Sequence, residues 1–409
     1  MYYQGGISVR CKHITIKSGK VWECVADGPR NPATGKRRQV KRRGRTRAIA
    51  KERVEDVLKS LKEDGIDKSV SSTITFDVIA SKWIKVYEAT GVKRGSVRIR
   101  RKEINILNRY FAKSPIGEIT HFMYQQMLMS LDDEGYARNT ISGVNTCANM
   151  IFNYAIRNKI IKDNPREGAI VPKKPQTVED LERDVISEMF FESDELDLFL
   201  NATLKLGLEL DKEWFYTLAF TGMRPGELIA LKKQDLDFEN NTIRISKTLY
   251  NENNNMKDYV LDTTKTNKAR TIDVDPLVME LLKSLVRRND KHKLEYKMKI
   301  DDFHDENFVF QHKNGYPFVT KNIASRMQRL LKVLDIKKDL TPHSFRHTYI
   351  SMSTEAGVDL PTIMQKVGHE DPDTTLKVYT HVTEKMKVRS VKNVSLHHRD
   401  ILEKLSFYI

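Results

Sequence analysis

Hydrophobic and polar positions alternate at the start of the chain and then recur at helical spacing. The alternation over residues 7–12 has the period of a strand, and the runs 21–25 and 38–43 indicate two more strands. A helix is expected over residues 46–63 because five apolar side chains share one of its faces: Ala50, Val54, Val57, Leu58 and Leu61. Residues 1–63 are therefore predicted to form a small three-stranded sheet with one helix.

A polar stretch without periodicity, residues 64–74, is predicted to be a linker. From residue 75 to residue 170 the apolar spacing becomes helical. It is clearest over 140–159, where one stripe contains Ile141, Val144, Ala148, Ile151, Phe152 and Ala155. We expect four or five packed helices in this region.

Residues 171–185, which contain Pro172 and Pro175, are predicted to be a second linker. The segment 186–395 mixes both periods: helices up to Phe220, strands over 242–249 and 268–274, and helices from about residue 321 onward. Residues 396–409 form a tail with spaced apolar positions. The expected fold is a mostly helical, multidomain α+β chain.

Composition narrows the class of protein. The chain has 409 residues, of which 39% are hydrophobic and 8% aromatic, and its mean hydropathy of −0.53 is typical of soluble folded proteins. No stretch approaches the roughly 18 apolar residues that a membrane span requires, and the N-terminus has no apolar leader. Cys11, Cys24 and Cys147 form no C-x-x-C motif, which disfavours a disulfide framework and a zinc knuckle. We expect a cytoplasmic protein.

Positive charge is concentrated at the N-terminus. The whole chain carries +15, and residues 1–60 alone contain 16 Lys or Arg against five acids. A two-stranded ribbon fits the DNA major groove, and basic side chains at this density neutralise phosphates, so double-stranded DNA is the predicted partner. A solvated basic face remains the alternative. The candidate contacts are Arg10, Lys12, Lys36, Arg37, Arg38, Lys41, Arg42 and Arg43.

Three separate segments of the last domain concentrate side chains of catalytic type. The first, Thr221–Leu228, has glycine and proline around Arg224 and indicates a sharp turn into a helix. The second, 263–271, contains Lys265 and is expected at the tip of a hairpin. The third begins at Thr341 and supplies His343, Arg346, His369 and Tyr379.

This set of side chains suits phosphoryl transfer. Two guanidiniums can hold the non-bridging oxygens of a phosphodiester and offset the charge of a pentacoordinate transition state. A tyrosine hydroxyl can attack as a covalent nucleophile, and a lysine or histidine can protonate the leaving hydroxyl. No carboxylate cluster accompanies them, so neither a metal nor another cofactor is predicted. We interpret the pattern as phosphoryl transfer through a protein-linked intermediate.

At these positions the sequence resembles the tyrosine recombinase (phage integrase) family. T-G-x-R-x-x-E-L at 221–228 is similar to the first family box and matches Arg224 to its first catalytic arginine. H-x-x-R-H, then G-H and Y-T-H, match His343, Arg346, His369 and the nucleophile Tyr379. Lys265 matches the general-acid lysine.

The resemblance covers almost the whole chain and implies its organisation and activity. Residues 1–63 look like the arm-binding domain of temperate-phage and Tn916-type integrases, 75–170 like the SAM-like core-binding bundle, and 186–395 like the catalytic domain. It implies a homotetramer that exchanges strands through a 3′-phosphotyrosyl link and a Holliday junction, without metal or ATP. It also implies binding to core and arm sites in a bacterial cell, with an excisionase and a host DNA-bending protein as partners. Phage and conjugative element remain open alternatives.

Several residues near the boxes have other interpretations. Lys268 and Arg270 share the predicted hairpin with Lys265 and compete for its role. Glu227 is expected to orient Arg224. Two more histidines also lie in the boxes: His347 is expected on a different helical face from His343, as a packed neighbour, and His381 is expected to support Tyr379.

Three rival functions share parts of this pattern. A chromosome-dimer recombinase would use the same chemistry without the basic N-terminal domain, and a type IB topoisomerase would not show these box spacings. A DNA-binding regulator would explain the basic segment but not the catalytic-type residues. Covalent attachment to DNA separates the regulator from the enzymes.

Overall fold

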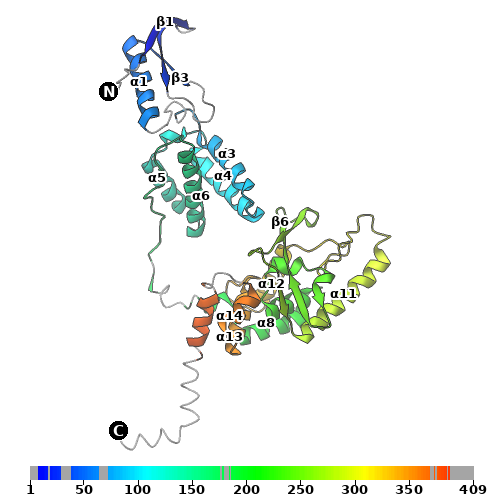
Figure 1. Cartoon of the computed structure of the whole chain (residues 1–409). Helices are drawn as coiled ribbons and strands as arrows, with labels where there is room; N and C mark the ends of the chain where they lie inside the picture. Colours follow the sequence, from blue (N-terminus) through cyan, green and yellow to red (C-terminus); the bar gives the residue numbers. More distant parts are fainter. Residues whose placement is uncertain are drawn as a thin grey trace, which may run out of the picture. The chain divides into compact units, whose positions relative to one another are not determined.

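The chain divides into two compact units, residues 1–175 and 176–409 (Figure 1). The computed structural model describes residues 8–16, 19–28, 38–63, 72–175, 177–178, 184, 186–368, 373, 375–384 and 386. His369, Lys36, Arg37, the side chain of Arg38 and the tail 396–409, all singled out from the sequence, lie outside this description.

The first unit begins with a three-stranded antiparallel sheet in the order β1 (Arg10–Ile16), β2 (Gly19–Gly28) and β3 (Arg38–Gly44). Helix α1 (Arg47–Glu63) packs on one face of this sheet. The predicted apolar face of the helix is confirmed, because all five of its side chains are buried against Cys24, Ala26 and Val40. Burial of this stripe supplies most of the small core.

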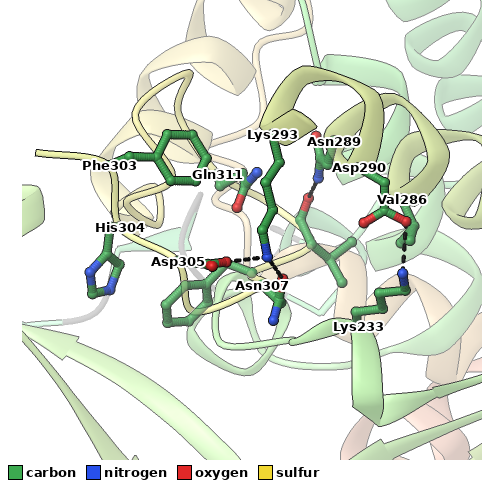
Figure 2. Close-up of a pocket in the computed structure, with 12 residues that line it drawn as sticks. Lys233, Val286, Asn289, Asp290, Lys293, Phe303, His304, Asp305, Asn307 and Gln311 are labelled. Atoms are coloured by element: carbon green, nitrogen blue, oxygen red, sulfur yellow. Dashed lines mark hydrogen bonds and ion pairs between the residues drawn. The ribbon is translucent and has the colours of Figure 1, made fainter. Parts of the chain in front are cut away.

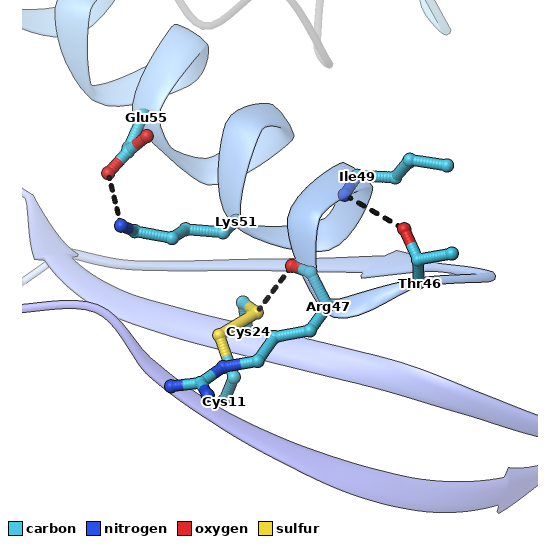
Figure 3. Close-up of a disulfide and its surroundings, with 7 residues drawn as sticks. All are labelled: Cys11, Cys24, Thr46, Arg47, Ile49, Lys51 and Glu55. Carbon is cyan, nitrogen blue, oxygen red and sulfur yellow. Dashed lines mark hydrogen bonds and ion pairs between the residues drawn. A yellow bond between two sulfur atoms is a disulfide. The ribbon is translucent and has the colours of Figure 1, made fainter.

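A disulfide joins Cys11 to Cys24 (Figure 3), so the prediction that disfavoured such a bond was wrong. The two cysteines are direct partners in the register of β1 and β2, and their Cα atoms are 4.0 Å apart. Register, rather than a C-x-x-C motif, brings them together. Cys147 is buried as a free thiol.

Four α-helices follow in the described part of the first unit: α3 (Phe76–Ala89), α4 (Arg94–Phe111), α5 (His121–Asp133) and α6 (Arg138–Arg157). The predicted stripe on α6 is confirmed, since every member of it is fully buried. The Thr120 hydroxyl accepts a hydrogen bond from the Met123 amide and caps α5. The core of this bundle forms a cluster separate from that of the sheet and α1.

The second unit is built around one large apolar core of helices and strands. Trp214, Phe215 and Phe345 are among its fully buried side chains. A helical segment over 375–384 lies near the end of the described residues. The other α-helices of the unit's described part are α8 (Ser193–Leu206), α9 (Asp211–Thr221), α10 (Pro225–Ile229), α11 (Pro276–Tyr296), α12 (Thr320–Val333), α13 (Ser344–Glu355) and α14 (Leu360–Val367).

The strands of the second unit place Lys265 differently from the prediction. Sheet β4-β5-β8 and ribbon β6-β7 comprise β4 (Leu236–Asp237), β5 (Thr242–Ile245), β6 (Lys247–Asn251), β7 (Tyr259–Thr263) and β8 (Arg270–Asp273). Ile245 pairs with Arg270, and Lys247 pairs with Thr263. Between these two pairs lies one residue, 246, on the side of β5 and β6, but six residues, 264–269, on the side of β7 and β8. These six residues form a loop. Lys265 is in this loop, whereas the hairpin tip is the segment between β6 and β7.

The predicted fold class, a basic sheet with a helix, then a helical bundle, then a mixed α/β domain, is confirmed by this order of elements. The division after Pro175 falls within the predicted linker 171–185. No helix in the described ranges is long and apolar enough to cross a membrane.

Candidate active site

A turn between α9 and α10 sets the position of Arg224. Gly222 ends α9 with φ of +60°, and a Cβ atom there would lie 2.6 Å from the Tyr349 ring, so only glycine fits without strain. Pro225 then starts α10, a position where its fixed φ suits a helix. The chain consequently reverses in a few residues, with Arg224 at the N-cap of α10.

Glu227 lies beneath Arg224 and is 1% exposed. Its Oε1 accepts a hydrogen bond from Arg224 Nη1 at 3.0 Å, and its Oε2 accepts one from the Arg224 amide at 3.0 Å. Burial raises the pKa of Glu227, but hydrogen bonding and charge from Arg270, together with the charge of Arg224, lower it below its usual value. The carboxylate is therefore ionised and orients Arg224, as the sequence suggested.

Arg346 is fully buried on α13. Its Nη1 donates to the carbonyl oxygen of Gly222 at 2.9 Å, which ties α13 to the same turn that positions Arg224. Burial and the charge of Arg224 lower the pKa of Arg346, while Glu227 opposes this shift. The two arginines thus share one turn and one electrostatic environment.

His343 lies one turn of helix before His347, and their ring centroids are 5.1 Å apart. The prediction that His347 faces elsewhere was wrong, because residues four apart on a helix share a face. Burial of the imidazole lowers the pKa of His343 to about 4, and the charges of His347, Arg346, Arg224 and Lys265 act in the same direction. Since His343 as a residue is exposed, water offsets part of this effect. At neutral pH its ring is a neutral acceptor.

A tight turn presents Lys265 to solvent. The Asn267 amide donates to the Thr264 carbonyl at 3.0 Å, and Asn267 adopts φ of +58°. The Thr264 hydroxyl donates to the Lys268 carbonyl at 2.7 Å and closes the loop. Lys265 is exposed, and its charge is felt at His343.

Tyr379 lies on the helical segment 375–384, which packs through Val378 and Val382 against Ile350 of α13 and Val367 of α14. The Tyr379 ring is half-buried in the same apolar cluster. Its hydroxyl makes no hydrogen bond to any residue in the part of the chain described. His381 instead faces Asp184, with Nε2 3.4 Å from the carboxylate oxygen.

Arg270 is a site residue whose partner the sequence did not reveal. Its Nη2 donates to Glu227 Oε2 at 2.7 Å, across 43 positions of the chain. The available signal is its place next to the basic loop that carries Lys265, which indicates a rival for that lysine's role and not a partner of Glu227. A bond to Glu227 depends on how β8 and α10 pack, which periodicity does not specify.

The basic face of the N-terminal sheet forms a second candidate site. Lys12, Glu23 and Arg43 are cross-strand neighbours in register, and Arg10 and Lys41 flank Val25 in the next row. Arg42 pairs instead with Cys24, so it points to the face that packs on α1. The structure thus brings four of the predicted contacts onto one open face and separates Arg42 from them.

A cavity between α11 and residues 303–311 is distinct from both sites (Figure 2). Lys233 pairs with Asp290 at 2.7 Å, and Lys293 pairs with Asp305 and with Asn307. None of the proposed catalytic residues lines this cavity. Within the described ranges, no three His, Cys, Asp or Glu side chains gather closely enough to hold a metal ion.

Comparison with known proteins agrees with this arrangement. The sequence profile of the phage integrase family matches residues 190–386, which include the described catalytic candidates. The probable integrase of prophage ps2 of Lactococcus lactis is 31% identical over 335 residues, covering 80% of this chain and 84% of that protein. The integrase of Staphylococcus phage L54a is 28% identical over 346 residues, covering 80% of this chain and 94% of its own length.

A solved structure has the same fold. The Tn1549 transposon integrase in complex with transposon right-end DNA superposes with a TM-score of 0.61 at 23% identity, covering 79% of this chain and 100% of that one. At this identity the match concerns the fold alone. The similarity to the lactococcal integrase, 31% over most of both proteins, confirms the predicted family: the chain belongs to the phage integrase family, whose members are site-specific tyrosine recombinases.

Proposed function

We propose that this recombinase cuts and rejoins DNA through Tyr379 to integrate and excise a phage or an integrative mobile element. The Tyr379 oxygen attacks the scissile phosphorus, and the bond from phosphorus to the 5′ oxygen breaks. A 3′-phosphotyrosyl link and a free 5′-hydroxyl result. The 5′-hydroxyl of the partner strand then attacks this link and releases the tyrosine.

The described residues have complementary roles in this reaction. Arg224 and Arg346 bind the non-bridging oxygens and stabilise the charge of the transition state. His343, neutral at physiological pH, accepts the phenol proton, and Lys265 donates a proton to the leaving 5′ oxygen. His369, by its match to the family box, is assigned to the same phosphate. No metal or other cofactor enters the scheme.

We assign the DNA contacts to separate regions of the chain. Residues 1–63 bind arm sites through the open basic face of β1, β2 and β3, while 75–170 and 186–395 bind the core site. The exposed Arg10, Lys12, Lys41 and Arg43 support the first assignment. We infer that the segments 64–74 and 171–185 are the linkers between these regions.

Strand exchange needs more than one copy of the chain. We propose a homotetramer on DNA that proceeds through a Holliday junction, with an excisionase and a host bending protein setting its direction. The tail 396–409 would dock on a neighbouring copy. Deletion of the tail that leaves assembly and cleavage unchanged would remove this last element of the proposal.

The observation that carries the proposal is the bond from Arg346 on α13 to the Gly222 carbonyl, in the turn that positions Arg224 at the N-cap of α10. His343 is the N-cap residue of the same helix α13. The test is a nicked duplex spanning the junction of the element with host DNA, incubated with the protein in EDTA. After cleavage the short fragment between the cut and the nick diffuses away with its 5′-hydroxyl. The covalent intermediate is then trapped, because this hydroxyl can no longer attack it. An SDS-resistant adduct is expected for wild type and not for Tyr379→Phe.

Tyr349→Phe is the matched control, because Tyr349 lies in the same apolar cluster as Tyr379. This variant should form the adduct at close to the wild-type rate. If wild type binds the duplex but forms no adduct, the chain is a DNA-binding protein and the proposal fails. An adduct that survives in Tyr379→Phe would assign the nucleophile to another residue.

A further inference from the structure

Arg270 lies at the base of the loop that carries Lys265 and is the first residue of β8. Its side chain is 12% exposed and points back into the unit rather than out with the loop. Nη1 and Nη2 donate to both oxygens of Glu227, at 3.3 and 2.7 Å. The fork therefore binds the carboxylate in the bidentate manner that guanidiniums favour.

The same guanidinium also fixes the end of α14. Arg270 Nε donates to the Lys366 carbonyl at 2.9 Å, in the last turn of that helix. A Cβ on Gly368 would lie 3.0 Å from Arg270 Nη1, so the glycine backbone packs directly on the guanidinium. Arg224 Nη2 lies 3.4 Å from the Gly368 carbonyl oxygen. Both arginines thus share two partners, Glu227 and the turn at Gly368.

Because Arg224 and Arg270 share the single negative charge of Glu227, the presence of both determines how much positive charge is available to a phosphate. Glu227 carries one negative charge and accepts hydrogen bonds from both guanidiniums. With both present, the group of three has a net charge of about +1. Without Arg270, Glu227 would neutralise Arg224 alone, and this pair would contribute no net charge.

We propose that Arg270 is a positioning residue for strand cleavage: it binds Glu227 and the Gly368 turn, and so leaves Arg224 oriented and electrostatically available for the scissile phosphate. This inference rests on the proposed function and adds a residue to it. Arg270 acts on Arg224 through Glu227, because within the described residues its side chain donates to Glu227 and Lys366 and not to the Lys265 loop.

The test uses the full-length chain and three versions of the nicked substrate. The first has the natural scissile phosphate. The second has a methylphosphonate, which lacks one non-bridging charge and depends less on a guanidinium. The third has a 5′-bridging sulfur, whose leaving thiolate needs no general acid. We compare Arg270→Gln with Arg244→Ala, an exposed arginine on the neighbouring strand β5.

Arg270→Gln should cleave the natural phosphate roughly 30-fold more slowly than wild type, below the ~100-fold or more expected for a direct transition-state donor. On the methylphosphonate the two proteins should differ by less than about threefold, while the bridging sulfur should leave the defect unchanged. Arg244→Ala should match wild type throughout. Arg270→Lys, which keeps the charge but not the fork, should recover part of the loss.

A second measurement separates positioning from general destabilisation. If Arg270 acts through Glu227, the double variant Glu227→Gln/Arg270→Gln should be no slower than Glu227→Gln alone. Equal defects on all three substrates, or rescue by the bridging sulfur, would overturn the proposal. If Arg270→Gln cleaves the natural substrate as fast as wild type, the proposal is also overturned, but the proposed function stays intact. Failure of wild type to cleave would instead reject the proposed function itself.

Discussion

Two carboxylates in this protein are each surrounded by cations, and their surroundings differ. Glu227 is buried between Arg224 and Arg270, whose side chains are 18% and 12% exposed. Glu23 is equally buried on the N-terminal sheet, but Lys12, Lys41 and Arg43 above it are 69%, 55% and 56% exposed. One carboxylate holds cations within the protein, and the other lies beneath cations that remain in water.

The difference separates two uses of positive charge. Cations that are partly desolvated and fixed by a shared carboxylate can meet a transition state without rearranging, which suits catalysis. Exposed cations on flexible stems interact weakly with a carboxylate and remain available to DNA phosphates, which suits affinity that depends on salt. Changes at Glu227, on the basic sheet face, at Glu23 and at His343 should therefore have distinct and progressively weaker consequences.

Removal of the Glu227 charge should have the largest effect. Glu227→Gln leaves Arg224 and Arg270 close together without a counter-charge, so we expect a loss of about 3 kcal/mol in the free energy of unfolding. Cleavage should fall at least ~100-fold, because Arg224 loses its orientation. Urea denaturation and the nicked-substrate assay measure the two effects. Glu239→Gln, at an exposed site, is the control, and equal behaviour of the two variants would contradict the account.

The basic face of the sheet should control salt dependence. Lys41→Ala/Arg43→Ala removes two phosphate contacts, so the slope of log K against log salt for arm-site DNA should become shallower by about 1.8. Arg42→Ala should change it much less, because Arg42 faces α1. Fluorescence anisotropy of full-length protein across a salt series measures the slopes. If Arg42→Ala changes the slope as much as the loss of Lys41 or Arg43 alone, DNA binds the face of the sheet that packs on α1 and not the open face.

Glu23→Gln should act in the direction opposite to Glu227→Gln. Hydrogen bonding from Arg43 and the charge of Lys41 lower the pKa of Glu23 although its burial acts to raise it, so the side chain is ionised at neutral pH. Its loss adds one net positive charge to the DNA-facing surface, and affinity for a random duplex should rise roughly threefold. Anisotropy with a non-specific duplex measures this. Weaker binding would mean that Glu23, like Glu227, holds its cations in place.

The smallest effect concerns pH. The pKa of His343 is lowered to about 4 in the folded protein, so the unfolded chain binds the proton more readily between pH 6.5 and 4. Stability must therefore decrease as pH falls through this window. Because His343 is exposed, the effect is modest. The Tm of DNA-free wild type should drop more between pH 7.5 and 5 than that of His343→Gln, and an equal drop would show that His343 titrates normally.

Periodicity and motif spacing predicted most of the fold and the chemical character of the site. The stripe on α6 and the face of α1 follow from local apolar spacing, which a chain must bury whatever its neighbours. The boxes around Arg224 and Arg346 could likewise be assigned from order and residue type. These features depend on residues that are close in sequence or on a fixed order of motifs.

Features that depend on register or on packing between distant segments could not be predicted. The Cys11–Cys24 bond follows from the pairing of β1 and β2. The loop at Lys265 arises because more residues separate β7 from β8 than separate their partners β6 and β5. The bond from Arg270 to Glu227 needs both β8 and α10 in place. The contact between His343 and His347 differs, because their spacing of four already indicated a shared face.

The most direct test of the account is to identify the atom that becomes attached to DNA. The trapped adduct would be digested with protease and nuclease, and the linked peptide sequenced by mass spectrometry. We predict a single peptide with a nucleotide joined through its 3′-phosphate to Tyr379, formed equally well in EDTA. A link to any other residue, or through a 5′-phosphate, would contradict the assignment of Tyr379 and the direction of strand cleavage.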